Sequence, residues 1–193
     1  MRGLDIMKIG IQGNKGSFSE IAAQVFMERQ QIKNGEIDYL ISSEPVLQAV
    51  ETGQVTYGII AIENAQGGVV IESVKALAEH RCEIIDMFHI LVKQNLLALP
   101  GTRIDQIKSI HSHQQALRQC RNFLADHFWG LPLIEENDTA EAARRLKEHL
   151  LPNTAGVIAN KACADLYGLT ILAEDIHDLK NNLTLFLGVK QFG

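Results

Sequence analysis

The chain has little of what marks secreted, disulfide-stapled or membrane-spanning proteins. Its 193 residues include three cysteines, four prolines and one tryptophan. An odd number of well-separated cysteines gives no disulfide framework, so the sequence predicts reduced, mostly buried thiols in a cytoplasmic protein. No apolar run reaches the length of a transmembrane helix. The first residues also lack the charged-then-apolar pattern of a signal peptide.

An excess of basic residues is also missing. The formal net charge is −5, with lysine and arginine scattered among aspartate and glutamate. This distribution argues against a nucleic-acid interface and against a basic surface for membranes. Apolar residues make up 46% of the chain, which is enough for an ordinary globular core. The length suits one large domain or two small lobes.

What is present is an alternation of strand and helix patterns. Strands are expected at residues 8–13, 56–64, 107–112, 131–137, 155–159 and 169–174, with one or two more between 86 and 99. Helices are expected at residues 20–32, 43–53, 71–80, 113–128, 142–150 and 160–168. Ser17 and Glu20 form a capping box before the first helix, and Asp138 caps a later one. The alternation predicts an α/β fold with mostly parallel sheet.

The chain closes on another apolar strand, residues 181–189, with the sequence NNLTLFLGV. Leucines and valine alternate with Thr184, Phe186 and Gly188, as expected for a strand. Threonine is a good strand former, so Thr184 can be there for its propensity alone. A catalytic hydroxyl is the alternative.

Three further segments lie where α/β folds bind ligands, beyond strand ends and at helix starts. They are residues 13–19, 62–68 and 109–115. The glycine-bearing loop 13–19 is either an ordinary turn or, with Lys15, an anion site. His111 and His113 lack nearby residues that would complete a metal-ligand set, so no metal is expected. Ser112 is expected to cap the helix there, with Gln115 directed to a cleft.

Five segments in order resemble the catalytic domain of the prephenate dehydratase family. They are GIQGNKGSFS (10–19), AIENAQGG (61–68), SHQQALRQC (112–120), DTAEAA (138–143) and NLTLF (182–186). The resemblance implies a two-lobed α/β fold similar to type-2 periplasmic binding proteins, with an interlobe cleft. Lobe 1 would hold residues 1–90 and 178–193, and lobe 2 residues 91–177. The two crossovers would fall near residues 88–92 and 174–180.

The resemblance also implies an activity, the conversion of prephenate to phenylpyruvate in phenylalanine biosynthesis, without a cofactor or metal. Carbon dioxide and water leave, and aromatisation drives the reaction. The hydroxyl of Thr184 would assist the departing hydroxide electrostatically, as a hydrogen-bond donor. Glu63, Asn64 and Gln115 complete the implied catalytic set. The implied substrate-binding residues are Asn14, Lys15, Gly16, Ser17, Ala65, Ser112, Thr139, Asn182 and Phe186.

Four positions depart from the family pattern. Leu185 replaces an arginine, Ala65 a serine, Gln114 a proline and Gln94 a histidine. An arginine on a substrate carboxylate makes a strong charge-assisted bond, so its loss should weaken binding unless Lys15 compensates. Two alternatives therefore stay open: a prephenate decarboxylase that does not aromatise, and a non-catalytic small-anion binding protein of the same fold.

Partners are predicted from the resemblance and from general frequencies. The expected partners are the small-molecule substrate and a second copy, since homodimers are the commonest assembly. The family's phenylalanine-binding regulatory (ACT) domain does not follow residue 186, so no feedback inhibition in cis is expected. Whether a separate regulatory subunit binds is left open.

Overall fold

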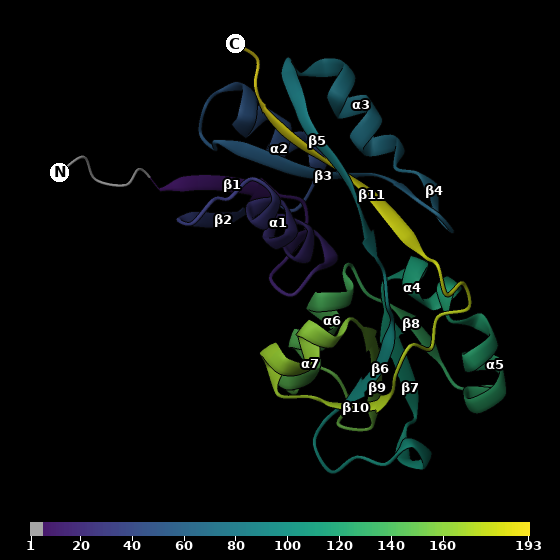
Figure 1. Cartoon of the computed structure of the whole chain (residues 1–193). Helices are drawn as coiled ribbons and strands as arrows, with labels where there is room; N and C mark the ends of the chain where they lie inside the picture. Colours follow the sequence, from purple (N-terminus) through teal and green to yellow (C-terminus); the bar gives the residue numbers. More distant parts are fainter. Residues whose placement is uncertain (1–5) are drawn as a thin grey trace. The chain divides into compact units, whose positions relative to one another are not determined.

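The computed structural model describes residues 6–193 and divides them into two compact units. Unit 1 contains the residues up to Leu91 together with Leu183–Gly193, and unit 2 contains Val92–Asn182. The chain therefore leaves unit 1 once and returns to it once (Figure 1). The chain returns to unit 1 at Leu183, whereas the resemblance implied a return at residue 178.

Unit 1 is built on one sheet in the order β2-β1-β3-β11-β5, with β4 paired to β3. The strands are β1 (Met7–Ile11), β2 (Gly35–Tyr39), β3 (Tyr57–Asn64), β4 (Gly68–Val69), β5 (Cys82–Leu91) and β11 (Leu183–Gln191). β1 runs parallel to β2 and β3, whereas β11 is antiparallel to both β3 and β5. The sheet is therefore mixed, and the prediction of a mostly parallel sheet is wrong. Leu183, the first residue of β11, pairs with Leu91, the last residue of β5, so β11 runs antiparallel to β5.

Three helices cover this sheet: α1 (Phe18–Arg29), α2 (Ser43–Glu51) and α3 (Ile71–Glu79). One core cluster joins α1 to Ile59, Phe88 and Phe186, and another joins α2 and α3 to Ile60, Leu187 and Val189. β11 is thus buried on both faces, which explains its continuous apolar run. Gly188 lets the strand approach α1, because a Cβ there would lie 2.4 Å from the Phe26 ring.

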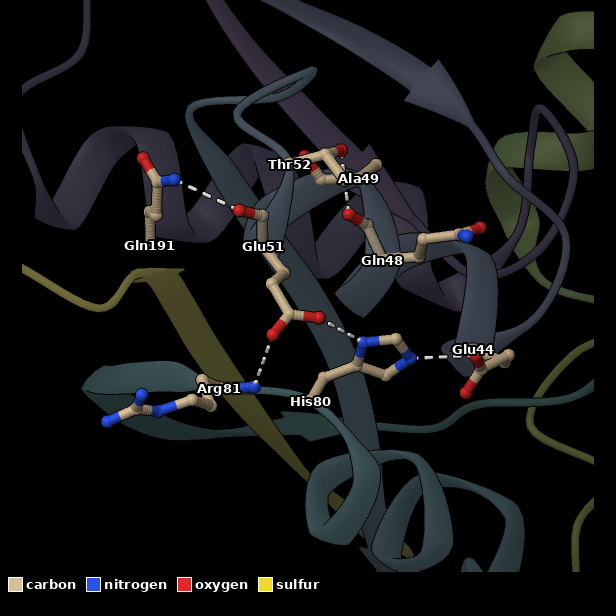
Figure 2. Close-up of polar contacts among 8 residues, drawn as sticks. All are labelled: Glu44, Gln48, Ala49, Glu51, Thr52, His80, Arg81 and Gln191. Atoms are coloured by element: carbon tan, nitrogen blue, oxygen red, sulfur yellow. Dashed lines mark hydrogen bonds and ion pairs between the residues drawn. The ribbon is translucent and has the colours of Figure 1, made fainter.

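A polar cluster ties α2 to the end of α3 (Figure 2). His80 Nδ1 lies 2.7 Å from Glu51 Oε2, and His80 Nε2 lies 2.7 Å from Glu44 Oε1. Gln191 Nε2 donates to the Glu51 carbonyl over 3.0 Å. Hydrogen bonds from Glu51 and Glu44 raise the pKa of His80, and the His80 bond lowers the pKa of Glu51. The ring therefore cross-links two helices most strongly when it is protonated.

Unit 2 carries a second mixed sheet, in the order β10-β6-β9-β7-β8. Its strands are β6 (Asn95–Ala98), β7 (Ser109–Ser112), β8 (Leu133–Glu135), β9 (Ala155–Ala159) and β10 (Thr170–Ala173). Its helices are α4 (Gln114–Gln119), α5 (Arg121–Phe128), α6 (Thr139–Lys147) and α7 (Lys161–Tyr167), with a 3₁₀ turn at Ile104–Gln106. The single helix expected over 113–128 is broken at Cys120.

Buried polar side chains cross the unit 2 core. His111 Nδ1 lies 3.0 Å from Glu136 Oε1, and His111 Nε2 lies 3.0 Å from the Ser109 hydroxyl. Arg145 of α6 donates to the other oxygen of Glu136. The buried carboxylate is therefore paired, as a charge in a core must be. The His111 ring is thus part of this buried hydrogen-bond network.

The cysteines are free thiols, and Cys120 and Cys163 are buried. Burial raises the pKa of Cys120 to about 12, so this thiol stays protonated and unreactive. None of the helices within residues 6–193 is long and apolar enough to cross a membrane.

Candidate active site

The pair at the centre of the candidate site is Asn64, the last residue of β3, and Thr184, the second residue of β11. They are cross-strand partners. Asn64 Nδ2 donates to Thr184 Oγ1 over 2.8 Å. Both side chains are buried, with 6% and 7% of their surface exposed. The antiparallel pairing thus joins two polar groups that are 120 residues apart in the sequence.

Two backbone bonds fix which way the Asn64 amide points. Its Oδ1 accepts from Gln66 N at 3.1 Å and Gly67 N at 2.8 Å. The oxygen is therefore held by the turn, and the nitrogen faces Thr184. Because Thr184 Oγ1 accepts from Asn64, the threonine keeps its own proton to donate. Among residues 6–193 no acceptor takes that proton.

Glu63, predicted to be catalytic beside Asn64, points to the other face of the sheet. Successive strand residues alternate in direction, and Glu63 pairs with Leu185 while Asn64 pairs with Thr184. A bulge at Ile62 precedes them, since Phe186 pairs with Ala61. Glu63 is exposed. The structure therefore does not bring its carboxylate to the threonine hydroxyl.

The loop before α1 is stabilised from within the protein. Ser17 caps α1 by accepting from Glu20 N at 3.3 Å, which confirms the expected cap. The Glu20 side chain returns to Gly16 N instead of Ser17 N, and Tyr39 also donates to it over 2.8 Å. Ser17 N donates to the Asn14 carbonyl at 3.1 Å.

This arrangement argues against the prediction that the amides of Gly16 and Ser17 hold substrate charge. The amides of Gly16 and Ser17 already have acceptors, and Gly13 N donates to Ile41 O at 2.9 Å. A protein carboxylate stands where a bound anion was expected, at the positive end of α1. Lys15 is exposed and Asn14 is half-buried, and both remain predictions as substrate contacts.

Unit 2 holds four of the predicted site residues: Ser112, Gln115, Thr139 and Asn182. Ser112 has no exposed surface and donates to Ile158 O over 2.6 Å, so it is a core residue. The cap of α4 is His113, whose Nδ1 accepts from Gln115 N at 3.3 Å. Gln115 is half-buried in the first turn of α4, and Thr139 is half-buried at the start of α6 after its cap, Asp138. Gln115 and Thr139 stay predictions.

Three further predicted contacts have partners within the protein. Phe186 is 1% exposed and stacks on Phe88 with ring centroids 6.2 Å apart, so it is part of the core. Ala65 N donates to the Leu183 carbonyl at 2.8 Å. Asn182 is buried, and its carbonyl accepts from Val92 N at 2.8 Å. Ala65 and Asn182 thus hold the chain together near residue 183.

A buried amide network escaped the sequence analysis. Gln94 Nε2 donates to Gln119 Oε1 over 3.2 Å, and Gln94 N donates to His177 Nδ1 over 3.4 Å. The position was noted only because the family has histidine there. Two glutamines 25 residues apart give no signal of contact. Among residues 6–193, no group of three or more metal-ligating side chains is placed to hold a metal ion.

The fold and the Thr184–Asn64 pair define the class: two α/β units, with a buried hydroxyl and amide joined across adjacent strands. The chain belongs to the prephenate dehydratase family, whose model matches residues 9–192. Its expected fold class, α/β and similar to type-2 periplasmic binding proteins, is confirmed.

Three relatives are between 26% and 37% identical to this chain. Arogenate dehydratase/prephenate dehydratase 1, chloroplastic, of Arabidopsis thaliana is 37% identical over 94% of this chain and 44% of its own. A prephenate dehydratase from Arthrobacter aurescens in complex with L-Phe is 26% identical, with a TM-score of 0.85, over 97% of this chain and 61% of that one.

A third relative has a different name. A structure described as GqqA, a novel type of quorum quenching acylase, is 26% identical with a TM-score of 0.78, over 96% of this chain and 64% of that one. The chain spans under half the length of the curated relative and under two thirds of the two solved chains.

Proposed function

We propose that the chain is a lyase that converts prephenate to phenylpyruvate, with loss of carbon dioxide and water. One observation carries the proposal. Thr184 accepts a hydrogen bond from Asn64 and keeps its own proton in a buried position. A hydroxyl held in this way can donate to a leaving oxygen without first breaking another bond.

The reaction mainly requires a hydrogen-bond donor at the departing hydroxyl. Carboxylate loss delivers an electron pair to the ring, and the ring hydroxyl departs as the aromatic system forms. The departing oxygen gains negative charge in the transition state. A preorganised donor in a dry site stabilises that charge. A positioned acid contributes about 10²–10⁴-fold to such steps. Since hydroxyls are poor acids, Thr184 acts mainly by hydrogen bonding, and the departing hydroxide takes its proton from solvent water.

The substrate is proposed as prephenate, with arogenate as the second candidate. The two differ in the side chain, which ends in a keto acid in prephenate and an amino acid in arogenate. The name of the Arabidopsis relative contains both activities. Since Thr184 acts on the ring hydroxyl that both share, the Thr184–Asn64 pair does not choose between them. Parallel assays with the two substrates are needed.

The deciding experiment is a product assay on purified protein and two variants of Thr184. Prephenate and arogenate are each incubated with enzyme, and phenylpyruvate and phenylalanine are followed by absorbance and mass spectrometry. Thr184→Ser keeps the hydroxyl and should retain turnover. Thr184→Val keeps the shape without the hydroxyl and should lose about 10²-fold or more in kcat.

Other products would support other functions. Loss of carbon dioxide with the hydroxyl retained would indicate the decarboxylase. Substrate binding without turnover would indicate the anion-binding protein. Hydrolysis of an N-acyl amide by the same sample would favour an acylase, the activity for which GqqA is named.

We also propose a cytoplasmic homodimer. The free thiols of Cys82, Cys120 and Cys163 suit a reducing compartment, and homodimers are the commonest assembly. Light scattering after gel filtration tests the dimer, and fractionation of the source cells tests the compartment.

A further inference from the structure

A pocket outside the candidate site lies in unit 2, between α4, α5 and β8. Its cavity volume is about 360 Å³, within the usual range for small-molecule sites. Leu117, Phe128, Leu131 and Leu133 supply much of its wall. Neither Gln115 nor any other proposed substrate contact lines it. The pocket is therefore a separate feature with its own chemistry.

Apolar surface dominates the pocket, and part of it is open to water. Trp129 belongs to the lining, although 87% of its surface is exposed, and Leu133 is 50% exposed. Isolated exposed apolar residues are ordinary, but several around one concavity mark a binding surface. Covering Trp129 and Leu133 would stabilise the occupant through apolar burial. The occupant therefore needs an apolar body.

Two guanidinium groups give the pocket its charge. Arg118 of α4 and Arg121 of α5 both line it and are exposed. Within residues 6–193, neither guanidinium group makes an ion pair or a hydrogen bond. The carboxylate of Glu135 accepts from Nε2 of Gln114, a lining residue, at 3.3 Å. Two unpaired cations against one carboxylate leave the site positive. Arginine favours planar anions such as carboxylate.

We propose that this pocket binds a small monocarboxylate with an aryl or branched alkyl body. The apolar part lies against Leu117, Phe128 and Trp129, and the carboxylate meets Arg118 and Arg121. The proposal does not rest on the proposed function, since it uses no residue of the Thr184–Asn64 pair.

The chain carries its own reporter for this site. Trp129 is the one tryptophan among the 193 residues, so tryptophan fluorescence reports on the pocket directly. The probes are 3-phenylpropionate and its neutral analogue 3-phenylpropan-1-ol, titrated into the full chain. The carboxylate should shift the emission to shorter wavelength as it covers the ring. It should bind about tenfold more tightly than the alcohol, because a hydrogen bond to a charged group is the stronger one.

Substitutions locate the binding. Arg118→Gln and Arg121→Gln should each weaken 3-phenylpropionate about tenfold and leave the alcohol unchanged. Arg103→Gln is the matched control, because Arg103 is an exposed arginine of the same unit that is paired with Asp105. It should change neither titration. Thr184→Ala should also leave binding intact, which separates this site from the catalytic one.

Three results would overturn the proposal. The emission could fail to respond to either probe, as expected if the surface takes a protein partner instead. Acid and alcohol could bind equally, which would mean that the guanidiniums do not select an anion. Binding that survives both arginine variants but is lost in Thr184→Ala would place the probe in the candidate active site.

Discussion

Leu185 lies directly across the β3–β11 ladder from Glu63, at the position where the family carries an arginine. Opposed residues on neighbouring strands have Cβ atoms about 4.5–5.5 Å apart. An arginine at 185 would therefore meet a carboxylate of the protein itself. Glu63 is exposed and Leu185 half-buried, so we expect Leu185→Arg to form an ion pair worth about 0.2–1 kcal/mol and to leave KM unchanged.

The pair is checked by a double-mutant cycle with Glu63→Gln, using thermal unfolding and steady-state kinetics. The coupling energy should appear in stability alone. A large fall in KM that persists in the Glu63→Gln background would show that the arginine position serves the substrate.

Asn64→Asp tests the direction of the hydrogen bond to Thr184. The new carboxylate still accepts from Gln66 and Gly67, but it can no longer donate to the threonine. Thr184 must then donate to this carboxylate, and its proton is no longer available. We expect kcat to fall about 10²-fold while the melting temperature changes little.

Asn160→Asp is the control for Asn64→Asp. Asn160 caps α7 by accepting from Cys163 N at 3.0 Å, and aspartate caps equally well. This control should keep full activity. Unchanged kcat in Asn64→Asp would mean that the Thr184 proton plays no part.

Glu20→Gln tests whether the loop before α1 is a structural cap or an anion site. A neutral side chain loses the charge at the helix N-terminus, so the free energy of unfolding should fall by about 1 kcal/mol. KM should stay the same. Tyr39→Phe removes one bond to Glu20 without changing its charge and serves as control. A lower KM in Glu20→Gln alone would show that Glu20 competes with a bound anion.

His80 should make stability depend on pH. Its folded-state pKa is raised above the ordinary 6.5, so its contribution is complete below that pH. The contribution disappears as pH rises through the raised value. Glu51, whose pKa is lowered, loses its contribution only in acid, as pH falls through its folded value. Melting temperatures measured between about pH 6 and pH 9 should fall more in the wild type than in His80→Gln.

His127→Gln is the comparison, because the His127 ring bonds a main-chain carbonyl of its own helix. The melting temperature of His127→Gln should change with pH as that of the wild type does. Parallel pH curves for the wild type and His80→Gln would contradict the cross-link.

Two neighbouring arginines of α6 allow a buried pair to be compared with surface pairs. Arg145→Met leaves the buried Glu136 without its cation, and we expect a loss of about 1.5–3 kcal/mol, the value of a hydrogen bond to a charged group. Arg144→Met removes pairs with Glu141 and Glu148 at the surface. It should cost under about 1 kcal/mol. Chemical denaturation of both variants gives the comparison, and equal losses would contradict it.

Local signals in the sequence predicted most helices and strands, but not the face of the sheet on which each strand residue lies. The Ser17 cap, the Gly168 helix end and the buried β11 strand each follow from a few adjacent residues. β2 was missed because its sequence GEIDY has only one aliphatic residue. Strand periodicity also could not reveal the bulge at Ile62, since an extra residue shows only against its partner strand.

The site was predictable where a motif implied a type of residue, and unpredictable where long-range partners decide. Thr184 and Asn64 were both predicted to be catalytic, but the sequence does not show which side chain donates the hydrogen bond between them. That follows from the turn amides of Gln66 and Gly67. Gly16 was expected to hold substrate, but Glu20 takes its amide. Ser112 and Phe186 were expected at substrate and lie in the core, because neighbouring elements cover them.

The placement of β11 also has a consequence for biogenesis. Unit 2 is contiguous, whereas the sheet of unit 1 needs β11 between β3 and β5. During translation, unit 2 leaves the ribosome before this central strand does. The growing chain then holds two sheet edges, on β3 and β5, that wait for one late segment. A ribosome stalled before codon 183 would display both open edges, a natural target for chaperones.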